Sequence, residues 1–160
     1  MIEQIIHPKN MHRACKHVVQ NEGSAGVDGM TVNGLTQYVR MHRAAIATRI
    51  INGKYLPQAI KGVAIPKSNG KTRLLGIPTV IDRWLQQSVA QTIAPRFEKE
   101  FTAHSYGFRP GRRAHDAVRR AQGYIQEGRR WVVDIDLEKF FDRVSHDILM
   151  GRLKKRITDR

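Results

Sequence analysis

Apolar residues recur at intervals of three or four along the first fifty positions, a spacing that predicts two amphipathic helices. The first apolar stripe begins after Pro8 and continues to Val19, and the second runs from Leu35 to Ile50. Between them, the glycine-rich stretch 21–31 interrupts the periodicity and is expected to form a loop.

A change from helical to alternating periodicity predicts a β-hairpin within residues 60–79. Two short apolar runs flank an Asn-Gly dipeptide there, which is a strong hairpin signal. The helical pattern then returns, and Thr79 is expected to cap a helix with Asp82 three residues on, a variant of the capping box. Pro95 is expected to end that helix.

The remaining residues predict a loop, a helix, a strand and a final helix. Residues 104–118 contain the loop and the start of the helix, and the alternation in 131–137 (WVVDIDL) predicts a strand. Ser145 is expected to cap the final helix. The expected fold class is therefore α/β of the α+β kind: three or so helices enclosing a hairpin, then one strand and one helix of a sheet that looks unfinished.

The charge balance is strongly basic and uneven along the chain. Lys and Arg total 28 against 14 Asp and Glu, which gives a formal net charge of +14 and a pI near 10.6. Residues 61–130 hold 14 basic and 5 acidic side chains, whereas residues 131–160 hold 7 and 6. A charge of this size favours a polyanionic partner such as a nucleic acid. A basic surface without a dedicated ligand is the alternative.

Composition excludes or disfavours several functional classes. No apolar run approaches the ~20 residues of a membrane span, and no basic amphipathic segment carries aromatic anchors, so a membrane partner is not expected. The single cysteine excludes an internal disulfide and fits a reducing compartment. The seven histidines show no zinc-ligand spacing, and neither of the common glycine-rich phosphate motifs occurs.

Two carboxylates lie within the predicted strand 131–137. Asp134 and Asp136 would share one face of the strand with Val132, opposite a good core face. Burying an ionised carboxylate costs on the order of several kcal/mol unless a charge or a metal compensates it. A site for a hard cation is one interpretation, because Mg²⁺ prefers carboxylate oxygens. A strand with one face open to solvent is the other.

Two further segments place cations where they can meet phosphates. The hairpin carries Lys67, Lys71 and Arg73 around its turn, although lysines on hairpins also serve to block edge pairing. The stretch 104–118 (HSYGFRPGRRAHDAV) combines two aromatic residues with three arginines, which suits nucleic acid through phosphate contacts and stacking. An aromatic-anchored loop at a helix start is the alternative.

Taken together and in this order, four motifs resemble the N-terminal part of a bacterial group II intron-encoded reverse transcriptase, also called a maturase. They are GVDG (26–29), IPKSNGKTRLLGIPTVIDRWLQQ (65–87), HSYGFRPGRRAHDAV (104–118) and VVDIDLEKFFD (132–142). On physical grounds alone GVDG predicts only a turn. The resemblance implies an N-terminal helical extension over residues 1–60, mostly helical fingers with the hairpin over 61–130, and an incomplete palm over 131–160.

The resemblance also implies roles for individual residues. Asp136 would be the catalytic strand-end aspartate that ligates the polymerase Mg²⁺, and the backbone carbonyl of Leu137 would add a ligand to a second ion. Phe141 would lie under the incoming sugar. Lys67 and Arg73 would hold the triphosphate of the incoming nucleotide.

RNA binding is expected of the basic segments. The implied partners are group II intron RNA, for splicing and retrohoming, and the RNA template and DNA primer of the polymerase reaction. The candidate RNA-binding side chains are Lys61, Lys71, Arg109, Arg112, Arg113, Arg119 and Arg120. The competing hypothesis is a non-catalytic basic module that binds structured RNA. A bacterial cytoplasm is the expected location.

One departure from the family pattern changes the expected activity. The family's second catalytic motif carries two adjacent aspartates, and no Asp-Asp pair occurs in this sequence. We therefore expect the chain, as a fragment of the polymerase, to bind RNA without polymerising. An unpaired strand at 131–137 would also favour pairing with another copy, so a homodimer or higher oligomer is expected.

Overall fold

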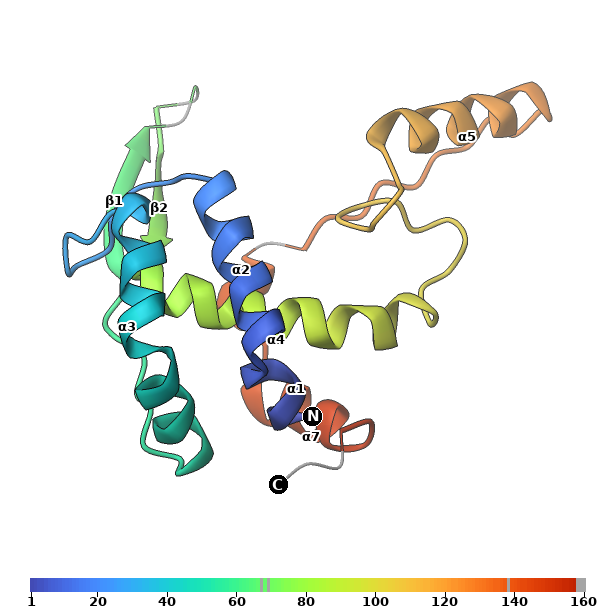
Figure 1. The fold of residues 1–160 in the computed structure, drawn as a ribbon. Coiled ribbons are helices and arrows are strands. Elements are labelled where there is room, and N and C mark those ends of the chain that lie inside the picture. The colour runs from blue at the N-terminus through green and yellow to red at the C-terminus, as the bar shows by residue number, and fades with distance from the viewer. Residues whose placement is uncertain (67, 69, 138, 158–160) are drawn as a thin grey trace. The chain divides into compact units, whose positions relative to one another are not determined.

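The computed structural model of the chain describes residues 1–66, 68, 70–137 and 139–157. Within these residues, three helices are followed by a two-stranded hairpin and then by four helices (Figure 1). This mixture of helices and a small antiparallel sheet confirms the predicted fold class. The chain divides into two compact units, Met1–Arg96 and Phe97–Arg160. Across the described ranges, every helix is too short or too polar to cross a membrane.

The first unit opens with three helices: α1 (Ile2–Ile6), α2 (Pro8–Gln20) and α3 (Val32–Ile51). Pro8 is the first residue of α2, a position where its missing N–H has no helical partner to lose. The apolar stripes that predicted α2 and α3 are the faces the two helices bury, which confirms both. Their buried residues are Met11, Ala14, Cys15 and Val18 on α2, and Val32, Leu35, Val39 and Ile46 on α3.

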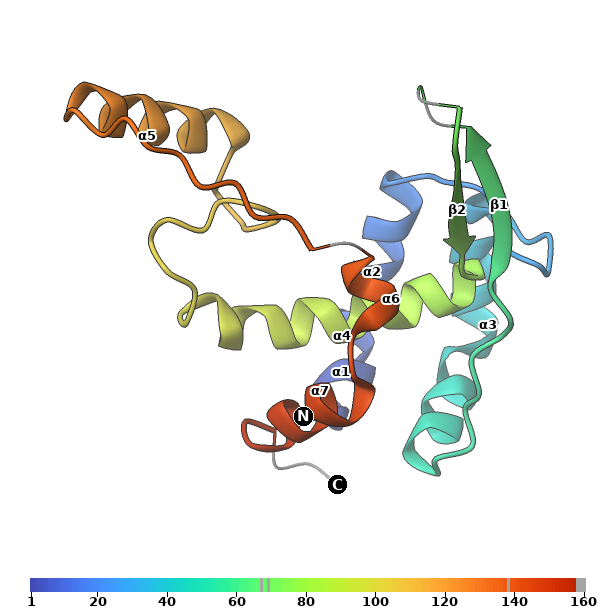
Figure 2. The same ribbon diagram turned by 180° about the vertical axis from the view of Figure 1, so that it is seen from behind.

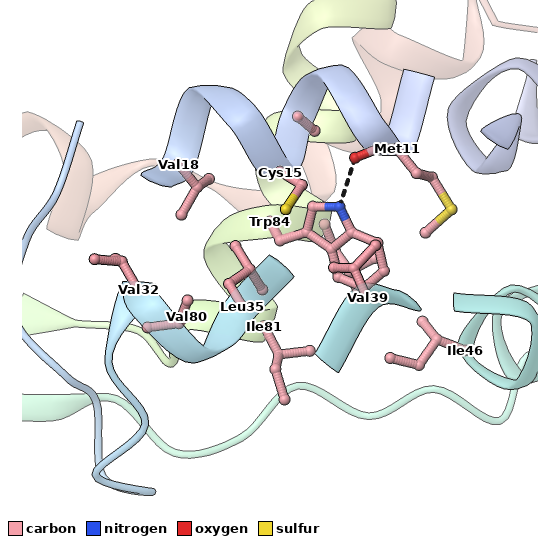
Figure 3. Packing of buried hydrophobic residues seen from close by; sticks show 12 residues of the cluster. Met11, Cys15, Val18, Val32, Leu35, Val39, Ile46, Val80, Ile81 and Trp84 are labelled. Carbon is pink, nitrogen blue, oxygen red and sulfur yellow. Dashed lines mark hydrogen bonds between the residues drawn. The ribbon is translucent and has the colours of Figure 1, made fainter. Parts of the chain in front are cut away.

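The core of the first unit is completed by α4 (Val80–Glu98), through Val80, Ile81, Trp84 and Leu85. The Trp84 side chain is fully buried, and its indole Nε1–H donates to the backbone carbonyl of Met11 at 2.8 Å (Figure 3). A buried indole needs such a partner, because an unpaired N–H would cost about 1–3 kcal/mol. This hydrogen bond fixes α4 against α2.

The predicted start of α4 is confirmed, and its predicted end is wrong. The Thr79 hydroxyl accepts from the backbone N–H of Asp82 at 3.2 Å and donates to the Asp82 carboxylate at 2.7 Å. The helix continues past Pro95 to Glu98. Proline removes a single backbone donor, and near the end of a helix this loss interrupts few remaining hydrogen bonds.

The predicted hairpin is confirmed as β1 (Lys61–Pro66) and β2 (Thr72–Ile77), which pair antiparallel (Figure 2). Gly70 lies in the connection with φ +77°, a left-handed conformation that glycine adopts without strain. The other residue of the predicted Asn-Gly signal, Asn69, is outside the described residues.

The second unit contains α5 (Ala114–Gln126), the short α6 (Phe140–Arg143) and α7 (His146–Lys154). Ser145 caps α7 as predicted, because its hydroxyl accepts from the backbone N–H of Ile148 at 3.4 Å. In the described part of the chain, all buried apolar side chains lie in the first unit. The second unit therefore depends on local hydrogen bonds and ion pairs more than on a core.

The prediction of a strand at 131–137 is wrong for this structure. The segment is an extended trace without regular secondary structure, and β1 and β2 form the only sheet among the described residues (Figure 2). A strand is stable only when a neighbour pairs with its backbone groups. With no such neighbour here, Val133 and Ile135 are 82% and 80% exposed.

Candidate functional site

The hairpin presents one face that mixes cationic and apolar side chains. Lys61 pairs with Ile77, and Ile65 pairs with Arg73. Directly opposed residues lie on the same face of a sheet, so Lys61 and Arg73 share a face. Arg73 lies opposite Ile65, four residue steps along β1 from Lys61, which is about 13 Å at ~3.3 Å per residue. Both side chains are exposed.

The structure describes two of the three cations predicted near the turn of the hairpin. Arg73 projects from β2 and Lys71 immediately precedes that strand, and both are exposed. Lys67 is outside the described residues. A guanidinium on a paired strand can form two parallel hydrogen bonds to a phosphate, and an ammonium beside it adds a point charge. The described end of the hairpin therefore carries side chains of the types that suit a phosphate group.

The base of the hairpin is anchored by the carboxylate of Asp82, which is 4% exposed. It accepts from the Tyr55 hydroxyl at 2.7 Å, the Thr79 hydroxyl at 2.7 Å and the backbone N–H of Gln58 at 3.1 Å. These donors compensate the burial of a charged group. Gln58 precedes β1 and Thr79 follows β2, so Asp82 ties both ends of the hairpin to α4.

The GVDG segment also packs at this base. The predicted turn is confirmed, with the Gly29 N–H donating to the Gly26 carbonyl at 3.3 Å. A Cβ on Gly26 would lie 2.7 Å from Cα of Thr79 and 2.9 Å from its backbone nitrogen. Glycine is therefore needed at this position because the backbone of Thr79 comes too close for any side chain.

Asp136 and Leu137 line a hollow of about 260 Å³ together with Phe140, Arg143 and Val144. Phe141 does not line it; this side chain is 87% exposed and meets the ring of Phe140 edge-on, with 5.4 Å between the ring centroids. The structure therefore brings Asp136, Leu137 and Phe140 together, and leaves the predicted sugar-binding Phe141 outside the hollow.

The described residues do not form a complete magnesium site at this hollow. Of the described side chains that line it, Asp136 is the only carboxylate, and Arg143 supplies a cation. No group of three or more potential ligand side chains gathers anywhere in the described ranges. A Mg²⁺ site normally needs more than one protein carboxylate, so these residues by themselves do not fit the ion.

The Arg109 side chain is occupied by contacts within the chain. Its guanidinium pairs with Glu98 at 2.8 Å and donates to the backbone carbonyls of Thr102 and Ser105 at 2.7 and 2.8 Å, and its side chain is 8% exposed. A guanidinium with these partners has few donors left for a phosphate. In this structure Arg109 organises the loop that follows α4, and the predicted RNA binding by this side chain would compete with these contacts.

The neighbouring arginines of this loop, Arg112 and Arg113, differ in whether their side chains contact other parts of the chain. Arg112 lies over the ring of Tyr106, 5.4 Å from its centroid, and donates to the carbonyl of Ala103 at 2.8 Å. Arg113 precedes α5, and its backbone N–H donates to the carboxylate of Asp116 at 3.1 Å. The side chain of Arg113 is exposed. Arg112 is partly used by the loop, whereas Arg113 faces solvent.

The two arginines within α5 are both exposed. Arg119 pairs with Asp116 at 3.3 Å, and Arg120 lies over the ring of Tyr124, with 4.6 Å between its guanidinium carbon and the ring centroid. Arginine stacked on an aromatic ring keeps N–H groups at its edge for further hydrogen bonds. Both residues are placed where a polyanion can reach them.

A basic face on α2 is missing from the sequence-based candidates. The exposed residues of this helix include three cations and two histidines, with no carboxylate among them: Lys9, His12, Arg13, Lys16 and His17. The signal was present in the sequence, because these positions fall on the side opposite the apolar stripe.

The sequence matches the family model described as reverse transcriptase (RNA-dependent DNA polymerase) over residues 65–160. This range begins within the hairpin and includes α4, α5 and the segment that carries Asp136.

Several proteins are similar along most of this chain. Protein YkfC of Escherichia coli (strain K12) is 33% identical over 165 residues, which cover 99% of this chain and 43% of that protein. Group II intron-encoded protein LtrA of Lactococcus lactis subsp. cremoris is 30% identical over 158 residues, covering 97% of this chain and 26% of LtrA. Nuclear intron maturase 1, mitochondrial, of Arabidopsis thaliana is 32% identical over 96 residues. The chain spans less than half the length of these relatives.

Proposed function

The chain belongs to the reverse transcriptase (RNA-dependent DNA polymerase) family, and from this premise we propose that it forms the fingers and the beginning of the palm of a group II intron-encoded polymerase. The whole polymerase would copy RNA into DNA and bind its intron RNA for splicing and retrohoming. The 160-residue chain alone would bind structured RNA and would not extend a primer.

The observation that carries this proposal is the family match over residues 65–160, which takes in both the hairpin arginine Arg73 and the aspartate Asp136. The names of two relatives, an intron-encoded protein and an intron maturase, support a role linked to intron RNA.

We assign phosphate binding to the exposed face of the hairpin. Arg73 would hold the phosphates of an incoming nucleotide, together with Lys67, whose position is outside the described residues. Anchoring by Asp82 would keep this face in place, because a rigid scaffold lowers the entropy cost of binding.

Asp136 would contribute one carboxylate to a magnesium site that needs further carboxylates. Two-metal phosphoryl transfer requires ligands that hold both ions against the charge that develops on the phosphate oxygens. The sequence has no Asp-Asp pair, and among the described residues Asp136 is the only carboxylate that lines its hollow. This shortage is our reason for expecting no polymerisation by the chain alone.

Primer extension tests the absence of polymerase activity. The purified chain, an RNA template, a labelled DNA primer, Mg²⁺ and dNTPs should give no elongated product. Elongation that requires dNTPs and disappears in the Asp136→Asn variant would contradict the proposal.

Fluorescence anisotropy tests RNA binding. A labelled structured intron RNA and a length-matched DNA duplex are titrated with the chain across a salt series. Affinity for both should fall as salt rises, because binding releases counterions, and RNA should remain tighter near physiological salt. Coincident curves would mean that the net charge of +14 binds polyanions without selecting RNA.

The basic face of α2 provides a matched comparison in the same assay. Lys9→Ala with Lys16→Ala should weaken RNA binding more than Arg152→Ala with Lys154→Ala. Both pairs remove two exposed charges, but the second lies on α7. Equal losses would point to net charge alone.

A further inference from the structure

We propose that Tyr124 is the centre of a phosphate-binding subsite, in which Arg120 and Arg129 grip the backbone of bound RNA. This inference rests on the proposed RNA-binding function and names a specific contact point for it. Its basis is a convergence of side chains that sequence reasoning did not identify.

Two guanidinium groups contact the same tyrosine ring. The guanidinium carbons of Arg120 and Arg129 each lie 4.6 Å from the centroid of Tyr124. They are therefore separated by no more than about twice that distance. Nδ1 of His104, which lies in the connection between α4 and α5, is 3.3 Å from the Tyr124 hydroxyl oxygen, so the ring is held at its tip as well.

Helix geometry places the first arginine. Arg120 and Tyr124 are four residues apart on α5, and side chains at this spacing are neighbours on a helix surface. Stacking on the ring orients the guanidinium and leaves its N–H groups at the edge. In the described part of the chain, Arg120 forms no ion pair with a carboxylate.

The end of the helix places the second arginine. The Gly128 N–H donates to the Ile125 carbonyl at 3.0 Å, and the Arg129 N–H donates to the Tyr124 carbonyl at 3.1 Å. These two bonds form a Schellman motif, which reverses the chain after α5 and returns Arg129 to the helix. Gly128 has φ +91°, a left-handed conformation that favours glycine.

Phosphate is the ligand that fits this arrangement. Each guanidinium stacked on the ring can offer N–H groups to the oxygens of a phosphodiester, so the two arginines can contact the same or neighbouring phosphates of an RNA backbone. Arg129 also contacts Glu127 at 3.6 Å, but the side chains of both residues are more than half exposed, and an exposed ion pair of this kind is weak. The ring already contacts two guanidiniums, so we infer backbone binding rather than base stacking on Tyr124.

Gly128 offers a test that changes no charge. Gly128→Ala should strain the Schellman motif and displace Arg129 while the net charge stays the same. In anisotropy titrations of a fluorescein-labelled RNA stem–loop at physiological salt, we expect this variant to lose about tenfold in affinity, the low end of the range for one charge-assisted hydrogen bond. Circular dichroism would verify that the helices persist.

Variants that remove one charge each, inside and outside the subsite, provide a matched comparison. Arg120→Ala and Arg129→Ala should each lose about tenfold in affinity. Arg130→Ala, which removes the adjacent exposed arginine, should lose only about twofold by its general charge. Tyr124→Leu should resemble the arginine variants, and Tyr124→Phe, which keeps the ring but loses the hydroxyl contact with His104, should lose less affinity than Tyr124→Leu.

The outcomes separate this inference from the proposed function. If the unchanged chain binds the stem–loop but Arg129→Ala, Arg130→Ala and Gly128→Ala bind it equally well, the subsite is refuted and RNA binding stands. If the unchanged chain does not bind the stem–loop at all, both are refuted. Selective losses at Arg120, Tyr124, Gly128 and Arg129 would establish the subsite.

Discussion

The Tyr55 hydroxyl donates a hydrogen bond to Oδ1 of Asp82 at 2.7 Å, joining the segment before β1 to the first turn of α4. Burial, followed by this hydrogen bond and the charge of Asp82, raises the pKa of the Tyr55 hydroxyl above its ordinary value of 10.0. The pair links a buried charge to the scaffold that carries the hairpin.

This pair predicts a specific dependence of stability on pH. Because the folded state favours the neutral hydroxyl, the contribution of Tyr55 is fully present below pH 10 and is lost as the pH rises above that value. Tyr55→Phe should cost about 1–2 kcal/mol in the free energy of unfolding at pH 8.

Urea denaturation of both proteins at pH 8 and pH 10.5 checks this. The original chain and Tyr55→Phe should differ less in their free energy of unfolding at pH 10.5 than at pH 8. At the higher pH the Tyr55 hydroxyl loses its proton in the unfolded original chain, and the variant has no such proton to lose. A difference that stays constant would contradict the role of this hydrogen bond.

Substituting glycines by alanine should have opposite effects at two positions. Gly26→Ala should destabilise the first unit by about 1–3 kcal/mol, because the new Cβ would lie 2.7 Å from Cα of Thr79 and the backbone must move. Gly34→Ala is the control. Gly34 lies in α3, and its Cβ would lie 3.7 Å from Cε of Met30, which precedes the helix; this is an ordinary contact, and alanine favours helix by up to about 1 kcal/mol. Thermal unfolding of both variants measures the difference, and equal effects would exclude close packing at Gly26.

Arg109 should be important for the order of the loop after α4. Arg109→Ala leaves the carboxylate of Glu98 and two carbonyls without a donor, so we expect local destabilisation of about 2–4 kcal/mol. Amide hydrogen exchange of residues 98–109 should become faster. Arg119→Ala removes a side chain that is 76% exposed from its pair with Asp116 and should change stability by less than about 0.5 kcal/mol. Similar exchange in both variants would mean that Arg109 does not hold the loop.

The exposed segment 131–137 should drive self-association. Its apolar side chains include Val133 and Ile135, and its backbone is open to pairing with another chain. Multi-angle light scattering should show dimers or larger species whose fraction grows with concentration. Ile135→Lys should reduce association more than Val132→Lys, which changes the side shared with Asp134 and Asp136 when the segment is extended. A monomer at all concentrations would contradict the prediction.

Much of the first unit was predictable from local pattern. The periodicity of α2 and α3, the Asn-Gly signal and the capping of α4 by Thr79 each depend on residues close together in the sequence. These local patterns predict the structure correctly because sterics and hydrogen bonds between nearby residues determine the helices and turns that they indicate. The same reasoning failed at 131–137, where a strand-like pattern has no paired strand among the described residues.

The candidate site was predictable by residue type and less so by role. Basic composition and motif order indicated nucleic acid and phosphate chemistry, and Arg73, Arg113, Arg119 and Arg120 are exposed. Residue type could not reveal that Arg109 is nearly buried in an ion pair, or that the ring of Tyr124 gathers two arginines. These facts depend on contacts between side chains, which are not encoded in spacing alone.

The sequence by itself determined the element types, the basic character and the family resemblance, because periodicity, charge and motif order are properties of the linear chain. The tertiary structure alone decided which glycine leaves no room for a side chain, which aspartate is buried and which arginines remain exposed. Gly26 meets Thr79 and Asp82 meets Tyr55 across long stretches of sequence. Such contacts form only when packing brings distant backbones together, and the burial that results decides whether a charged side chain supports the fold or faces solvent.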